Sequence, residues 1–184
     1  MPVQKVTREE ILQKAMLVFK RQGYHRTTME DLAQACGLLK GSFYHYFRSK
    51  EVLMKEVLLY FNVVNEKQLF SIAYDEDKPP KQRLEHLLDA LFNGIVRSEG
   101  GCLMGNTALE TTLVTEAFTE PLRVHFNNAL AALTHLYRTN HPPEKAQELA
   151  EQTTAEIQGS LVLVKVFGNE QLLTDCRNRA VERL

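Results

Sequence analysis

The sequence predicts an all-α fold from two kinds of observation. Apolar residues recur at helical spacing through most of the chain, and no segment alternates like a half-buried strand. Residue pairs that cap helix starts, together with glycines and prolines, separate these helical segments. We expect three short N-terminal helices in residues 1–48, joined by a long helix to a C-terminal helical domain in residues 49–184.

The first helix is expected to begin at Thr7. Thr7 and Glu10 have the spacing of a capping box, in which two side chains satisfy amides at a helix start. Gly23 ends the pattern, because glycine readily adopts the positive φ that follows many helices. The apolar face expected to pack inward consists of Ile11, Leu12, Ala15, Val18 and Phe19.

Two shorter helices are expected between residues 27 and 48. Thr27 and Glu30 form a second capping-box pair, so the first of these helices should begin near Thr28 and end at Gly37. The other helix contains the run KGSFYHYF. Two helices of this size with a glycine-containing turn match the helix-turn-helix motif, whose second helix enters the major groove of DNA.

The second short helix has two different faces. Phe43 and Phe47 lie four residues apart and are expected to pack inward, with Leu38 re-entering the core before them. The opposite face is polar or basic and carries Lys40, Gly41, Ser42, Tyr44 and His45. We therefore expect this second face to lie on DNA.

Six further helical segments follow, separated by glycines, prolines and the acidic connection DEDKPP. The clearest of them has apolar residues at i, i+3 and i+4 spacing between Lys81 and Glu99. The segments expected to be helical are 49–74, 81–99, 102–112, 121–140, 143–168 and 169–184.

The last two segments need a surface to pack against. The first of them combines small residues, which permit close helix approach, with aliphatic residues that gain from burial. These residues are Ala155, Ile157, Gly159, Ser160, Leu161 and Val164. In a two-fold dimer, such helices pair with their own copies as a four-helix bundle. Burial within one chain is the alternative explanation.

Charge is unevenly divided along the chain, although the net charge is only -1. Residues 1–50 contain nine Lys or Arg against four Asp or Glu, a net charge of +5, and the remainder has 13 against 19, a net charge of -6. A small basic region beside an acidic remainder is expected where that region contacts phosphates. Chance variation on a solvated surface would give the same division.

Neither a secretion signal nor a membrane span is indicated. The start MPVQKVTREE has no apolar segment, and the richest apolar run, LVLVKVF, is interrupted by Lys165 and too short for a bilayer. We expect a cytoplasmic protein that does not bind membranes. Cys36, Cys102 and Cys176 are widely separated, which indicates neither a disulfide framework nor a zinc site. We expect no metal and no other cofactor.

The run TTMEDLAQACGLLKGSFYHYFRSKEVL resembles the N-terminal signature of the TetR family of bacterial transcriptional regulators. That signature combines a glycine-terminated helix, a KG-x-x-Y-x-Y/H-F core and a K-E pair. The resemblance covers roughly residues 7–54, and the matching positions are Lys40, Gly41, Tyr44, Tyr46, Phe47, Lys50 and Glu51.

The resemblance implies a homodimeric repressor on double-stranded DNA, bound to a near-palindromic operator until a small-molecule effector releases it. Residues 1–48 would be the helix-turn-helix DNA-binding domain. Residues 49–184 would be the effector-binding and dimerisation domain, paired through its two C-terminal helices.

The resemblance also assigns expected roles on DNA. Tyr44 and Lys50 would hold phosphates, while Leu39 departs from the Ser or Thr that is often found at its position. Base edges or nearby backbone would be contacted from the second short helix, and further contacts would come from the helix before it. The full set of expected DNA-binding residues is Thr27, Thr28, Lys40, Gly41, Ser42, Tyr44, His45 and Lys50.

An effector enclosed by the helices that follow residue 49 would stabilise one position of the long helix and change the separation of the two recognition helices. The alternative is that these side chains form a dry core. The expected effector-binding residues are Phe61, Phe92, Cys102, Met104, Asn106 and Phe126.

The segment Gly101-Cys102-Leu103 is similar to one in TetR regulators that sense electrophiles or oxidants through its cysteine. A thiol at a helix start has its thiolate favoured by unpaired amides and the helix dipole, which increases its reactivity. The alternative is a small buried hydrophobic residue.

Two other functions are alternatives to regulation. A small helical enzyme is disfavoured because the chain has no HExxH, GxSxG or GxxxxGK[ST] motif. An architectural DNA-binding protein without an effector shares the same N-terminal pattern, and only release from DNA by a ligand distinguishes the two.

Overall fold

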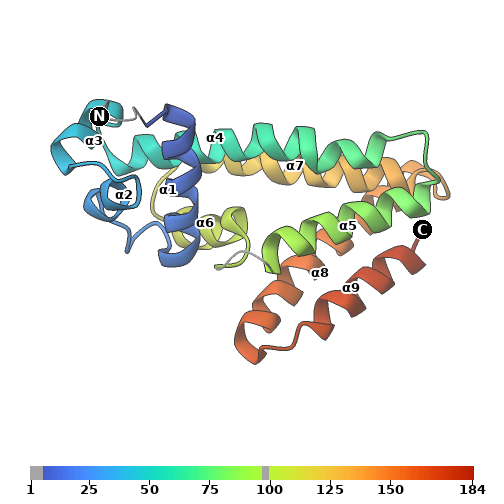
Figure 1. Cartoon of the computed structure of the whole chain (residues 1–184). Coiled ribbons are helices and arrows are strands. Elements are labelled where there is room, and N and C mark those ends of the chain that lie inside the picture. The colour runs from blue at the N-terminus through green and yellow to red at the C-terminus, as the bar shows by residue number, and fades with distance from the viewer. Residues whose placement is uncertain (1–5, 97–99) are drawn as a thin grey trace. The chain divides into compact units, whose positions relative to one another are not determined.

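The computed structural model describes residues 6–96 and 100–184, and every regular element in those ranges is a helix (Figure 1). The all-α prediction is therefore confirmed. In this part of the chain, no helix is both long and apolar enough to cross a membrane. The elements are α1 (Arg8–Gln22), α2 (Met29–Ala35), α3 (Lys40–Tyr46), α4 (Lys50–Gln68), η1 (Phe70–Tyr74), α5 (Pro80–Val96), α6 (Leu103–Thr111), α7 (Thr119–Tyr137), α8 (Pro143–Phe167) and α9 (Gln171–Glu182).

The chain forms two compact units. The N-terminal unit contains the described residues of Met1–Asn62 together with Cys102–Leu122, and the C-terminal unit contains those of Val63–Gly101 and Arg123–Leu184. The α6 segment thus belongs to the same compact unit as the helix-turn-helix. The functional division at residue 48 remains a prediction, because compactness does not show which residues bind an effector.

Helix starts and ends agree with the sequence in most places. Thr7 and Glu10 form the predicted capping box, and Gly23 follows α1 with a φ of 79°. Ser49 accepts a hydrogen bond from the Val52 amide at 3.2 Å, as expected for the start of α4. The predicted end of α5 at Glu99 lies outside the described residues.

The capping of α2 corrects the sequence analysis. The cap is Thr28, whose hydroxyl accepts from the Asp31 amide at 3.2 Å, and the pair is Thr28–Asp31 instead of Thr27–Glu30. Thr27 is buried, and its hydroxyl donates to the carbonyl of Gly23 at 2.6 Å. Because this bond closes the turn after α1, the next threonine caps α2.

The predicted helix 49–74 is also shorter than expected. It ends at Gln68, and Phe70–Tyr74 forms the 3-10 helix η1. Leu69, Phe70 and Ala73 are all buried in the C-terminal core. The change in helix type is therefore associated with core packing, for which the sequence offers no glycine or proline signal.

Tyr137 joins three helices of the C-terminal unit. Its side chain is completely buried, its hydroxyl lies 2.9 Å from the hydroxyl of Thr153 on α8, and it donates to the carbonyl of Ala180 on α9 at 3.0 Å. A guanidinium on α9, Arg177, donates through two nitrogens to Asp89 on α5. These bonds fix α5, α7, α8 and α9 as one packed group.

The small and aliphatic residues of α8 face two ways. Ile157 and Ser160 are buried, and Leu161 and Val164 are half-buried against the same core. Ala155 and Gly159 are exposed. Packing within the chain thus accounts for the aliphatic residues and Ser160, and it leaves Ala155 and Gly159 uncovered.

His125 of α7 is a buried histidine of the C-terminal unit, with its ring 5.6 Å from that of Phe70. Burial lowers its pKa to about 4, because the imidazolium form would lose its hydration. The unfolded chain binds this proton near pH 6.5 whereas the folded chain does not. Stability contributed by neutral His125 is therefore complete above pH 6.5 and is lost as the pH falls towards 4.

The parent protein should lose about 3 kcal/mol of unfolding free energy through His125 as the pH falls from 6.5 to about 4. We predict that His125→Gln abolishes this loss. Urea denaturation at a series of pH values measures this difference. His86→Gln, which changes an exposed histidine, should retain the dependence of the parent protein. Identical pH profiles for all three proteins would contradict the prediction.

Candidate nucleic-acid interface

Helix α3 is packed on one face only. Phe43 and Phe47 are buried, with ring centroids 6.2 Å apart, so their predicted structural role is confirmed. The opposite face is open to solvent. It exposes five of the residues predicted to contact DNA, namely Lys40, Gly41, Ser42, Tyr44 and His45.

The two predicted threonines occupy different environments. Thr28 is exposed at the start of α2, where its hydroxyl donates to the Asp31 carboxylate at 2.7 Å. Thr27 is only 1% exposed. The structure therefore places Thr28 on the surface at the start of α2 and buries Thr27 in the turn after α1.

Lys40 has a carboxylate neighbour on α2. Its Nζ lies 3.4 Å from Glu30, and both side chains are largely exposed. Such a pair contributes little to stability, because water screens it and both side chains lose freedom in forming it. The ammonium is accordingly available to exchange this carboxylate for another anion.

Lys50, at the start of α4, is engaged with the turn between α1 and α2. Its Nζ donates to the carbonyls of Tyr24 at 2.7 Å and His25 at 3.2 Å, and it lies 4.4 Å from the centre of the Tyr24 ring. Partial burial lowers the pKa of this ammonium. Lys50 therefore has a structural role that its position in the motif did not indicate.

The same turn is also held by Glu110 of α6. The His25 amide donates to its carboxylate at 3.2 Å, and the His25 ring nitrogen Nε2 lies 3.0 Å from its carbonyl oxygen. A Cβ at Gly23 would lie 2.5 Å from Glu110 Oε1. Tyr24 also meets Phe118, in an edge contact with centroids 4.9 Å apart. No pattern in the sequence indicates this role for Glu110, which is 85 residues from His25.

Arg8 is a second residue that sequence analysis missed. Its guanidinium donates to Glu56 on α4 at 3.0 Å and to the carbonyl of Tyr46 at 3.2 Å, and it lies 4.3 Å from the centre of the Phe47 ring. It thereby joins the start of α1 to the end of α3. No local spacing signals such a contact, because the partners lie 38 and 48 residues away.

The six predicted effector residues are divided between the two units. Four of them belong to the N-terminal unit: Met104 is completely buried, and Cys102, Asn106 and Phe61 are half-buried. Phe92 and Phe126 belong to the C-terminal unit. Neither unit alone brings all six together, and their role remains a prediction.

Cys102 caps α6 with its sulfur. The Gly105 amide donates to Sγ at 3.3 Å, and the side chain is half-buried. Cys36 and Cys176 are buried, and burial raises the pKa of each thiol. Among the residues that the structure describes, no three His, Cys, Asp or Glu side chains form a group that would hold a metal ion.

Comparison with protein families decides the relationship of the chain. Residues 80–179 match the C-terminal domain of LmrA/YxaF-like transcriptional regulators, and residues 11–57 match the bacterial regulatory proteins of the tetR family. The chain belongs to the TetR family. It is a DNA-binding transcriptional regulator and not an enzyme, and the predicted family is confirmed.

One sequence relative supports this assignment, and two solved structures have a similar fold. The chain is 30% identical over 169 residues to an HTH-type transcriptional regulator from Lactococcus lactis, covering 87% of this chain and 84% of the relative. Its fold resembles that of a TetR regulator from Legionella pneumophila, with a TM-score of 0.89, 23% identity and complete coverage of both chains. It also resembles a cysteine mutant of CifR bound to a 26-bp operator, with a TM-score of 0.79, 21% identity, and coverage of 99% and 98%.

Proposed function

We propose that this TetR-family protein is a homodimeric repressor that a small-molecule or electrophilic effector releases from a near-palindromic operator. The observation that carries the proposal is the exposed polar face of α3, which is supported from behind by Phe43 and Phe47. The CifR structure of similar fold contains operator DNA. A DNA partner also favours a cytoplasmic location.

The proposed contacts divide into positioning and sequence recognition. Tyr44 and Lys50 hold phosphates, and Thr28 adds a contact from α2. Lys40, Ser42 and His45 face base edges or nearby backbone, since they lie on the exposed side of α3. Gly41 presents no side chain, which permits close approach of the DNA backbone. Thr27 is proposed to act indirectly, because it closes the turn before α2.

We predict that Lys40→Ala weakens binding to the operator about tenfold and relaxes preference at one base position, because it removes a contact to a base edge. Lys50→Met should weaken binding to operator and random DNA similarly, and should reduce the salt dependence. Fluorescence anisotropy on an operator selected from random DNA, at several salt concentrations, measures both effects.

Lys55→Met is the matched control for Lys50, since Lys55 is exposed on the same helix. It should preserve the denaturation midpoint, whereas Lys50→Met should lower it by removing two hydrogen bonds to the turn. An equal loss on specific and random DNA for Lys40→Ala would contradict its assigned role, because the variant would then behave like Lys50→Met.

The homodimer is proposed to form through α8 and α9. Val162, Val166 and Phe167 on α8 are 53%, 67% and 71% exposed, beside the exposed Gly159. Covering these side chains with the same surface of a second copy removes apolar area from water. It also gives the two recognition helices the symmetry of a palindromic site.

Val166→Asp should convert the dimer to a monomer, because it would place two carboxylates in an apolar contact. Light scattering should show the mass falling to that of the 21.1 kDa chain. Leu113→Asp, at a leucine that is 99% exposed on the other unit, should leave the dimer intact. A parent protein that is already monomeric at the concentrations used on DNA would overturn this part of the proposal.

Effector response is proposed to act through α6. The helix begins at the half-buried Cys102 and, near its other end, Glu110 contacts the turn between α1 and α2. A ligand or thiol adduct that displaced α6 would disturb this contact. Coupling between effector and DNA would be reciprocal, and is typically worth about 1–3 kcal/mol in allosteric proteins.

We predict that substoichiometric N-ethylmaleimide modifies Cys102 before Cys36 or Cys176, since only Cys102 is accessible, and that it releases the operator. Peptide mass spectrometry locates the adduct, and anisotropy follows release. Cys102→Ser should abolish release, whereas Cys36→Ala should preserve it. If N-ethylmaleimide releases the Cys102→Ser variant from the operator as readily as the parent protein, the proposed sensing by this thiol is wrong. Failure of every tested effector to release DNA would favour an architectural role.

A further inference from the structure

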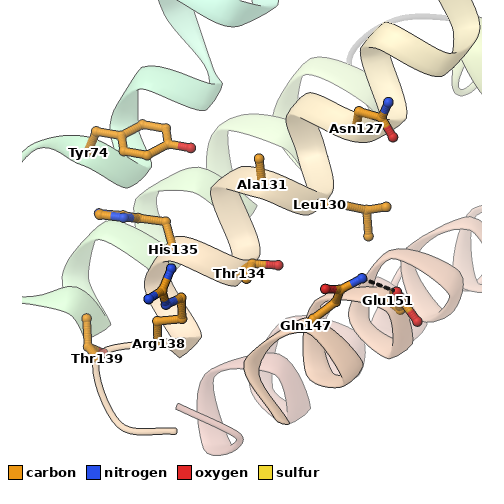
Figure 2. A pocket seen from close by; sticks show the side chains of 10 residues that line it. All are labelled: Tyr74, Asn127, Leu130, Ala131, Thr134, His135, Arg138, Thr139, Gln147 and Glu151. Atoms are coloured by element: carbon orange, nitrogen blue, oxygen red, sulfur yellow. Dashed lines mark hydrogen bonds between the residues drawn. The ribbon is translucent and has the colours of Figure 1, made fainter. Parts of the chain in front are cut away.

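The C-terminal unit contains a cavity of about 670 Å³ that opens between Tyr74 at the end of η1, the outward face of α7 and the N-terminal half of α8 (Figure 2). This volume is typical of sites that bind small molecules. None of the six predicted effector residues lines the cavity. It is therefore separate from the site assigned to the effector that releases DNA.

One wall of the cavity is aromatic. The rings of Tyr74 and His135 have centroids 4.5 Å apart with an interplanar angle of 37°, and Tyr74 is 47% exposed. The two rings lie together on one side of the cavity in Figure 2. Aromatic rings that are already packed on each other offer a flat surface to a planar ligand, with little freedom left to lose on binding.

A positively charged side chain, Arg138, lies next to the aromatic wall. Arg138 follows His135 by almost one turn of α7, and its side chain is exposed. Within the described chain, no carboxylate lies within ion-pair distance of its guanidinium. A guanidinium presents parallel N–H donors that match the two oxygens of a carboxylate. Arg138 is therefore suited to hold an acidic group of a ligand whose ring lies on Tyr74.

The facing wall limits the charge of such a ligand. Gln147 and Glu151 lie across the cavity on α8, and the Gln147 amide donates to the Glu151 carboxylate at 3.0 Å (Figure 2). A carboxylate on this wall repels ligands that carry several negative charges, such as nucleotides. The lining thus favours a single acidic group over a polyanion.

We propose that this cavity binds a small aromatic carboxylate, with the ring against Tyr74 and the acid group on Arg138. The site lies outside the assigned DNA and effector sites, so it does not depend on either. A second copy of the chain covering the same groove is the competing occupant, and the experiment below distinguishes the two.

The absence of tryptophan from the chain permits a direct test. Indoleacetate is an aromatic carboxylate whose indole group can be excited selectively, so its fluorescence anisotropy reports binding to the protein as it exists in solution. Indoleacetamide is the matched neutral ligand. Arg138→Gln removes the proposed contact, and Arg123→Gln changes an exposed arginine of the same helix that does not line the cavity.

Saturable binding of indoleacetate is expected for the parent protein and for Arg123→Gln. Arg138→Gln should weaken it at least tenfold, which corresponds to about 1.4 kcal/mol. Indoleacetamide should bind the parent protein at least tenfold more weakly than indoleacetate and should be indifferent to Arg138→Gln. Tyr74→Leu should weaken both ligands.

The proposal is overturned if indoleacetate does not saturate, if both arginine variants bind it alike, or if the acid and the amide bind equally. It is also overturned if Arg138→Gln changes only the mass of the protein in solution, which would assign the groove to a second copy. Because no DNA is present, these outcomes do not depend on operator release.

Discussion

The turn between α1 and α2 is the constraint on which the N-terminal unit depends. The Lys50 ammonium donates to two of its carbonyls, while Glu110 accepts from its His25 amide. Exposed pairs contribute little in water, but hydrogen bonds that involve a charged group contribute about 1.5–3 kcal/mol, and the bond from Lys50 to the Tyr24 carbonyl is partly buried. Helices α1, α4 and α6 consequently meet at this turn, which leads directly into α2.

This arrangement gives α6 two ends with different chemistry. Cys102 caps its start through a sulfur that accepts an amide hydrogen bond, and modification of that sulfur would remove or weaken the cap. Glu110 lies one residue before its last residue, against the turn. A helix of nine residues is stiff on the scale of its own length, so a shift at one end is expected to reach the other. The proposed regulation uses this connection within a single compact unit.

The C-terminal unit is organised by different forces. Its core is apolar, and Tyr137 adds buried hydrogen bonds that specify how α7, α8 and α9 meet. The same helices leave an apolar strip of α8 and the cavity beside Tyr74, which combines an aromatic wall with charged side chains, uncovered. Two separate uncovered surfaces on one unit are consistent with one partner protein and one small ligand, as proposed.

The sequence by itself determined the helices, most of their ends and the two faces of α3. These follow from periodicity, capping and glycine conformation, which act over a few residues. The family was indicated separately, by the resemblance of roughly residues 7–54 to its N-terminal signature. Only the tertiary structure decided that Thr28 caps α2, that η1 follows α4, and that Lys50, Glu110 and Arg8 clamp the N-terminal unit. Those contacts join residues that are distant along the chain, and their energies depend on burial and geometry that no local pattern encodes.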